Sequence, residues 1–231
     1  MPNQHNYGFR FFRSLSGSDT PQIFTLPIAS GYAPNTGVDG AGGTAVNLNV
    51  GDPVQLIDGG TLRLVQPGQA TTTAVLDDAT FGVVVGFARV FVNGGIRPNS
   101  YYPSGTTYTG GIGGQNATLV SVIPVKDNIF EIDAGAAPGT SFDDQSEWAG
   151  AVGKGAHFTY SVLTSGIGQP KANPLISTTF DSTTGVRQLR VVGLSKLGDT
   201  QDYTAANVRL QVMFNAVQLS GYTPQTADIE T

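Results

Sequence analysis

Short runs of large apolar and β-branched residues recur along the whole chain, separated by Gly, Pro, Asn and Asp. This pattern is typical of strands joined by turns, not of amphipathic helices, so it predicts an all-β protein. The candidate strands cover residues 53–57, 62–65, 81–92, 117–125, 129–133, 157–163, 188–194 and 208–219.

The last of these runs alternates at its start. Val208, Leu210 and Val212 fall on one face, and Arg209 and Gln211 fall on the other, which predicts a half-buried strand.

The run that begins at Phe81 is apolar on both faces, which predicts a central strand with other parts of the protein packed on both faces. Its glycines indicate a bulge or a close approach of another backbone.

Turn residues punctuate two of the apolar runs. Asp58-Gly59-Gly60 separates two strands and Asn93-Gly94-Gly95 follows the longest one, so both predict hairpins. Only residues 143–152 read as helical, with Ser141 or Asp143 as the expected cap, so at most one short helix is expected.

The chain divides into five stretches. We expect an extended N-terminal arm and irregular segment over residues 1–44, a first β portion over 45–96, a loop or linker over 97–116, a second β portion over 117–220, and a C-terminal tail over 221–231. The two portions form either a pair of small β-barrels, jelly-roll or SH3-like, or one β domain, since all-β domains reach this length. Residues 31–48 and 97–116 read as long surface loops, inert or functional.

Composition excludes several classes of site. Cysteine is absent, which rules out thiolate metal ligands and a cysteine nucleophile and fits synthesis in a reducing cytoplasm. The net charge of −5 gives no broad basic surface for nucleic acid. No signal peptide and no membrane span are expected from the apolar runs.

Catalytic residues are equally scarce. His5 and His157 are the only histidines, too few for a zinc cluster, and His157 is expected to be a packed or rim residue. The carboxylate pairs Asp77-Asp78 and Asp143-Asp144 lie beside turn residues, where Asp commonly caps the backbone. We therefore expect no enzyme, no cofactor and no metal.

One short segment departs from this background. Residues 7–13 hold four aromatic and two Arg side chains, the types enriched at interface hot spots. An arm that clamps a partner and an ordinary edge strand of the chain's own fold are both open interpretations. With tyrosines and a tryptophan of the later loops, the candidate contact residues are Tyr7, Phe9, Arg10, Phe11, Phe12, Arg13, Tyr101, Tyr102, Tyr108 and Trp148.

The strand motifs carry a family resemblance over about residues 50–215. Gly51-Asp-Pro-Val-Gln-Leu, Gly60-Thr-Leu-Arg-Leu-Val and Phe81-Gly-Val-Val-Val-Gly-Phe resemble the barrel opening of capsid decoration (cement) proteins of tailed bacteriophages. Four later segments are similar to phage head structural proteins: Val122-Ile-Pro-Val-Lys-Asp-Asn-Ile-Phe-Glu-Ile-Asp-Ala, Trp148-Ala-Gly-Ala-Val-Gly, Gln188-Leu-Arg-Val-Val-Gly-Leu and Asn207-Val-Arg-Leu-Gln-Val.

The resemblance implies a non-enzymatic virion protein, made in the host cytoplasm, that binds the outer surface of the capsid and bridges adjacent capsomers. Its partners would be the major capsid protein and copies of itself, as a homotrimer before a homodimer. The competing interpretation is a receptor- or carbohydrate-binding β module of a tail fibre or adhesion protein, with Trp148, Tyr101, Tyr102 and Tyr108 as stacking platforms.

Overall fold

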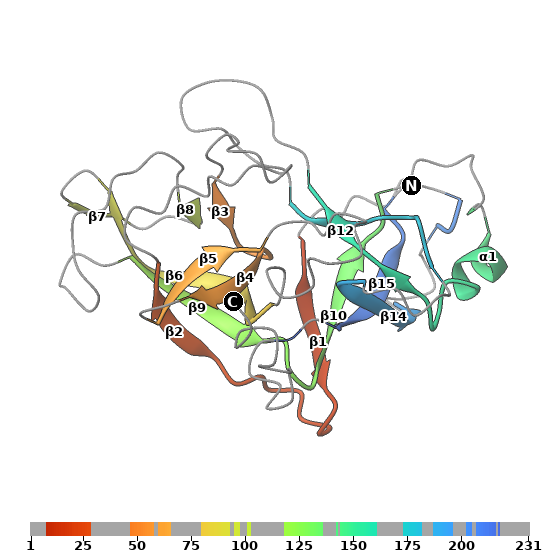
Figure 1. The fold of residues 1–231 in the computed structure, drawn as a ribbon, viewed down its shortest axis with the longest axis horizontal. Helices are drawn as coiled ribbons and strands as arrows, with labels where there is room; N and C mark the ends of the chain where they lie inside the picture. Colours follow the sequence, from red (N-terminus) through yellow and green to blue (C-terminus); the bar gives the residue numbers. More distant parts are fainter. Residues whose placement is uncertain are drawn as a thin grey trace, which may run out of the picture.

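The computed structural model confirms the all-β class, with strands throughout and a single short helix in the part of the chain that it describes. It describes residues 8–28, 47–57, 60–65, 80–92, 95–97, 101–102, 118–135, 142, 144–160, 173–181, 187–195, 202–204, 207–215 and 217. Two antiparallel sheets dominate, with sheet B on the left of Figure 1 and sheet A on the right.

Sheet A holds five strands in the order β1-β10-β15-β14-β11. They are β1 (Arg10–Ser14), β10 (Asn128–Asp133), β15 (Arg209–Phe214), β14 (Leu189–Leu194) and β11 (Gly155–Ala156). The two-stranded ladder of β12 (Phe158–Thr159) and β13 (Leu175–Ile176) adjoins it through a bridge between Ala134 and Ile176.

Sheet B holds the remaining long strands in the order β2-β9-β6-β4-β5, with β7 paired to β6. They are β2 (Phe24–Pro27), β9 (Leu119–Pro124), β6 (Gly82–Val92), β4 (Pro53–Ile57), β5 (Thr61–Leu64) and β7 (Gly95–Arg97). The sheet curls until Ile28 meets Leu62 in one isolated bridge. No closed barrel is present among the described strands, which form antiparallel sheets, as the all-β prediction requires.

Between β1 and β10 the chain passes from sheet A to sheet B and back again. It leaves β1 of sheet A for β2 of sheet B, and it returns from β9 to β10 through the turn at residues 125–127. Strand β9, which the sequence placed in the second β portion, therefore belongs to the same sheet as β4 and β6. The passage from sheet B to sheet A therefore lies at this turn.

The N-terminal segment is an edge strand. β1 pairs with β10 from Arg10 to Ser14, and Phe9 is buried just before it. Of the two interpretations for residues 7–13, the strand of the chain's own fold is correct for residues 9–13, and the extended arm is wrong there. Tyr7 lies outside the described residues.

One hydrophobic core runs through both sheets. Phe9 packs against Phe158 and Phe214, with ring centroids 5.8 and 4.8 Å away. Its amide N–H donates to the carbonyl O of Gly51 beside sheet B, at 2.9 Å. β1 thus lies between the sheets and joins them (Figure 1).

β6 is the central strand that the apolar run predicted. It lies between β9 and β4, and its ladder with β9 shifts register at Val84/Gly86 and Phe87/Arg89, which are the expected bulges. Gly82 has the expected close approach, because a Cβ there would lie 2.8 Å from the Ile123 carbonyl O.

Both predicted hairpins form. β4 and β5 pair up to Ile57 and Thr61, and Gly60 between them has a φ of +72°. β6 and β7 pair up to Val92 and Gly95, across the predicted Asn-Gly turn. The geometry follows from turn residues that tolerate positive φ.

The two predicted surface loops are only partly described. Strands β3 (Leu48–Asn49) and β8 (Tyr101–Tyr102) form a short ladder between them, and Leu48 and Tyr102 are buried. At these positions the loop prediction is wrong, since a large apolar side chain at each anchors the ladder in the core.

The helix α1 (Gln145–Ala149) is shorter than residues 143–152. Its cap is Asp144, not Ser141 or Asp143: the carboxylate Oδ1 accepts from the amide N–H of Glu147 at 2.8 Å.

The predicted alternation of β15 is present: Val208, Leu210 and Val212 are buried. Arg209 is buried too, contrary to a half-solvated strand. Its Nε donates to Asp133 Oδ1 at 2.9 Å. A buried ion pair therefore lies on the face of the sheet opposite to Val208 and Leu210.

Candidate functional site

A groove of about 410 Å³ opens where the chain crosses between the sheets. One wall is the connection from β1 to β2 and the other is the turn between β9 and β10, with Phe81 at the start of β6 between them. Its lining residues are Ser14, Ser16, Ser18, Thr20, Pro21, Gln22, Phe24, Phe81, Pro124, Lys126, Asp127 and Asn128. Both crossings between the sheets therefore build one site.

The two walls are held together by hydrogen bonds to the turn. Asp127 has a φ of +58°, a conformation that Asp tolerates better than most residues. Its carbonyl O accepts from the amide N–H of Leu15 at 2.8 Å and from Ser14 Oγ at 3.3 Å. Asn128 Nδ2 donates to the Pro124 carbonyl O at 2.7 Å, which closes the turn.

The connection from β1 to β2 lines the groove mostly with polar side chains, and its two large aliphatic side chains lie outside the groove. Every even-numbered residue from Ser14 to Phe24 lines the groove, whereas Leu15 and Ile23 do not. These two are 53 % and 56 % exposed, the highest values among the large hydrophobic side chains described. One segment thus supplies two different surfaces.

Phe12 adds a third exposed apolar side chain, at 40 %. It is the extra residue at the register shift between Phe11 and Arg13, so it has no partner in the β1–β10 ladder. A bulge of this kind re-aims a side chain, and the Arg13 guanidinium lies 5.5 Å from the Phe12 ring centroid. We name Phe12, Leu15 and Ile23 the apolar strip.

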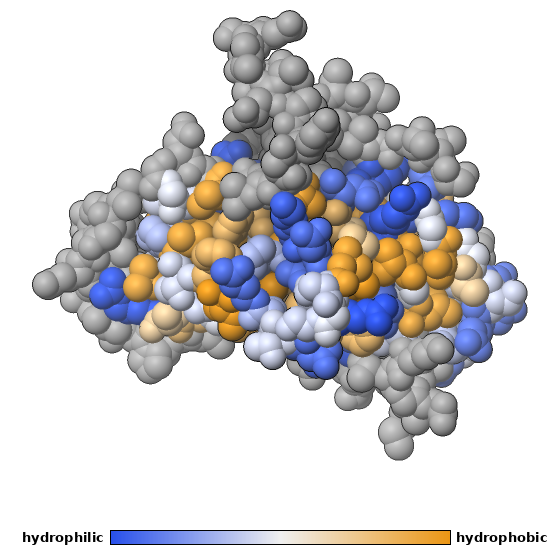
Figure 2. All heavy atoms as spheres, turned by 90° about the horizontal axis from the view of Figure 1, so that it is seen from below, coloured by the Kyte–Doolittle hydropathy of each residue, from blue (hydrophilic) through white to orange (hydrophobic). Residues whose placement is uncertain are grey.

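Figure 2 views the molecule from the side along which the connection from β1 to β2 runs in Figure 1. Hydrophobic side chains gather in two areas, separated by a band of polar ones. This side therefore presents both polar and apolar side chains.

The predicted contact residues fall into two groups. Phe9, Tyr102 and Trp148 are buried in the core. Trp148 packs on Phe142 and Phe180 and donates from Nε1 to the Tyr203 carbonyl O at 3.1 Å. These three side chains therefore cannot contact a partner or stack on a sugar.

The other predicted contact residues that the structure describes lie at or near the surface. Arg10, Phe12, Arg13 and Tyr101 are exposed, while Phe11 is partly buried and packs edge-on against Phe130. Tyr7 and Tyr108 lie outside the described residues.

Sequence reasoning missed Leu15, Ile23 and the groove. Leu15 is an isolated aliphatic residue among polar residues and glycine, whereas Ile23 directly precedes Phe24 and reads as the start of an apolar run. The groove brings residues 14–24 to residues 124–128, a distance in sequence that no local pattern encodes.

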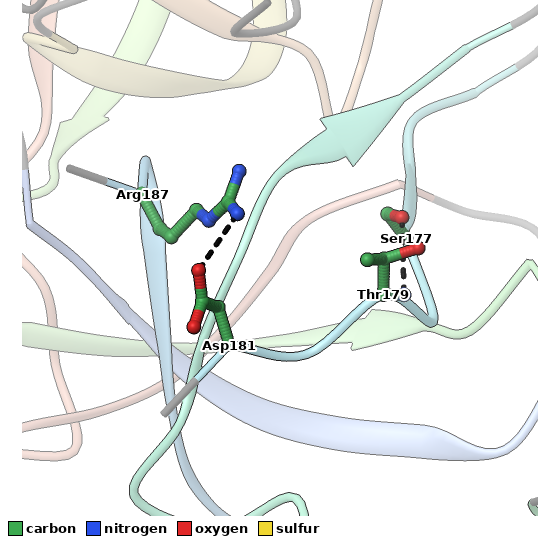
Figure 3. Close-up of polar contacts among 4 residues, drawn as sticks. All are labelled: Ser177, Thr179, Asp181 and Arg187. Atoms are coloured by element: carbon green, nitrogen blue, oxygen red, sulfur yellow. Dashed lines mark hydrogen bonds and ion pairs between the residues drawn. The ribbon is translucent and has the colours of Figure 1, made fainter. Parts of the chain in front are cut away.

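A second polar cluster lies beside β11 (Figure 3). Arg187 Nη2 pairs with Asp181 Oδ2 at 2.9 Å, and both are partly exposed. Nearby, Thr179 donates its amide N–H to Ser177 Oγ at 3.3 Å. The aliphatic part of the Arg187 side chain packs over Gly155, where a Cβ would lie 2.8 Å from Arg187 Cγ. We therefore assign this cluster a structural role, covering the edge of sheet A at β11.

His157 belongs to the same region and is a partly buried rim residue, as expected. Its Nδ1 lies 3.4 Å from Gln188 Oε1, while its Nε2 is buried without a partner. Burial lowers the pKa of His157 below 6.5, and the charge of Arg187 lowers it further, against the opposing effect of the Gln188 contact.

Buried carboxylates occur on β10. Glu131 Oε1 accepts from Ser195 Oγ at 2.6 Å, and Asp133 pairs with Arg209. Each is committed to a partner inside the fold. Across the described ranges no three His, Cys, Asp or Glu side chains gather as a metal site, and no described helix is long and apolar enough to cross a membrane.

Comparisons with protein-family profiles, with curated proteins and with solved structures find no match for this chain. The functional argument therefore depends on its own residues.

Proposed function

We propose that this chain is a non-enzymatic virion structural protein that binds the outer surface of a bacteriophage capsid and cements adjacent capsomers. The observation that carries the proposal is the apolar strip, three exposed large hydrophobic side chains within twelve residues of one connection. Each of these side chains gains free energy when a partner removes it from water.

The strip is supported by a rigid element. β1 is paired to β10, its neighbour Phe9 is buried in the core, and the following turn is bonded to Asp127. A surface held in this way loses little conformational entropy on binding, which supports a permanent structural contact over a transient one.

The energetic scale suits a repeated lattice. Burying one Phe or Leu side chain contributes about 1.5–3 kcal/mol, so a single strip gives a modest affinity. If the protein is a homotrimer, as we propose, a second strip binds with an effective concentration on the order of millimolar and the complex becomes stable.

The charge pattern supports the same partner. The net charge of −5 disfavours nucleic acid, and Arg10 and Arg13 give β1 a local positive charge suited to an acidic patch on the major capsid protein. The site in the virion would be the capsid surface.

Co-sedimentation with undecorated capsids of the phage that encodes the chain tests the proposal. We expect saturable binding at a fixed number of copies per capsomer, and a cryo-EM map should place β1 and the connection to β2 against the shell. No binding, or a map with β1 facing solvent, would refute it.

A further inference from the structure

We propose that the groove between the two sheet crossings is a binding site for a neutral saccharide. This goes beyond the proposed capsid contact, because the apolar strip is not part of the groove lining. Neither Leu15 nor Ile23 lines the groove.

Hydroxyl and amide groups dominate the lining. The Ser14, Ser16 and Ser18 hydroxyls already take part in hydrogen bonds within the protein and keep only their remaining capacity for a ligand. Thr20 adds a hydroxyl, and Gln22 adds an amide with no hydrogen-bond partner among the described residues. Groups that both donate and accept are what a ligand with many hydroxyls requires, since each ligand hydroxyl does the same.

The lining of the groove contains one positively charged and one negatively charged side chain. Lys126 and Asp127 are adjacent on the turn and exposed, and neither side chain has an ion-pair partner in the described part of the chain. Their charges cancel at a distance, so the groove does not attract phosphate or carboxylate ligands. At close range the ammonium donates to, and the carboxylate accepts from, neighbouring sugar hydroxyls.

An aromatic ring completes the site. Phe24 is 38 % exposed and lies edge-on to the buried Phe81, with centroids 6.2 Å apart. The Phe81 contact fixes the ring, and the exposed part offers an apolar face to the C–H face of a pyranose. An aromatic ring beside hydroxyl groups suits a sugar, which has both an apolar C–H face and hydroxyl groups, better than it suits a purely apolar ligand.

The size and rigidity of the groove fit a small ligand. Its volume of about 410 Å³ falls in the range of small-molecule sites. Both walls are tied to Asp127, and Pro21 and Pro124 restrict the backbone on either side. We therefore expect the site to need little reordering on binding, and because it is open, we expect weak affinity.

The test is an NMR titration of the full ¹⁵N-labelled chain with glucose, galactose, N-acetylglucosamine and maltose, up to tens of millimolar. We expect at least one sugar to shift amide signals of residues 14–24 and 124–128. Gln22→Ala, Lys126→Ala and Asp127→Asn should each weaken binding about tenfold, whereas Gln145→Ala on α1 should not. The Asn variant retains the turn, because Asn also tolerates positive φ.

Three outcomes overturn the inference: no shifts with any sugar, shifts that the groove variants leave unchanged, or shifts at these residues with inorganic phosphate alone. Phe12→Asp should bind sugar like the wild type. Failure of this site is therefore distinguishable from failure of the capsid proposal.

Discussion

The amide N–H of Phe9 donates to the carbonyl O of Gly51 at 2.9 Å, and through this bond the first described strand joins the two sheets. The ring of Phe9 packs in the sheet A core at the same point. The aromatic and Arg-rich composition of residues 7–13 suggested an interface, but Phe9 is part of the protein's own core. Only the exposed side chains that follow it, Arg10, Phe12 and Arg13, remain accessible to a partner.

Replacing Phe9 tests this role. Phe9→Ala should lower the free energy of unfolding by about 3–5 kcal/mol, the cost of a large cavity in a packed core. Phe12→Ala, on the exposed side of the same strand, should change it by less than about 1 kcal/mol. Urea denaturation of both variants measures the difference, and equal midpoints would contradict the core position of Phe9.

Gly8 has a steric requirement that Gly17 lacks. Both have positive φ, +70° and +84°, but a Cβ at Gly8 would lie 2.7 Å from the Gly51 carbonyl O, whereas Gly17 faces open space. Gly17→Ala should therefore cost about 1–2 kcal/mol of folding free energy for the backbone conformation alone. Gly8→Ala should lower the folding stability clearly more, as measured by thermal unfolding. Equal losses of stability in the two variants would show that the contact between Gly8 and Gly51 tolerates a methyl group.

The buried pair of Asp133 and Arg209 should be costly to break. Arg209→Met leaves a buried carboxylate unpaired and should lower the stability by about 3–5 kcal/mol. The double variant Asp133→Leu, Arg209→Met should recover much of that loss. Arg187→Met, at the partly exposed pair with Asp181, serves as the control and should cost less than about 1 kcal/mol. A double variant no better than Arg209→Met would contradict the assignment.

His157 should make the stability depend on pH. Burial lowers its pKa in the folded state, so the unfolded chain binds a proton more readily. Stability is therefore complete above the ordinary value of 6.5 and falls as the pH drops below it, until the folded pKa is passed. Melting temperatures measured between about pH 7.5 and 5 should decline less in His157→Asn. An identical decline in the variant would assign it to other groups.

Strand positions are predictable here because alternation and turn residues are local. The β6 bulges and the Gly-containing hairpins follow from residues within a few positions of each other. The pairing partners of those strands are distant in sequence: β9 pairs with β2 across roughly a hundred residues. This pairing depends on how the strands pack together in the folded core, which local sequence patterns do not encode.

The candidate site shows the same limit. Composition selected aromatic residues, but it does not distinguish Trp148, which fills the core, from Phe12, which a bulge turns outward. Exposure depends on the register of one strand against another, and a one-residue shift exchanges the two faces. Leu15 and Ile23 were missed because aliphatic residues usually lie inside a fold.

The central claim is that the apolar strip docks the protein on a capsid. Its most direct measurement is the dissociation constant for undecorated capsids, compared between the wild type, the double variant Phe12→Asp, Leu15→Asp, and Val152→Asp. Val152 is 43 % exposed but lies after α1, away from the strip in the sequence, so it is the matched control. The proposal predicts that the strip variant binds at least about a hundredfold more weakly, while Val152→Asp binds like the wild type. Equal binding by all three folded proteins would contradict it.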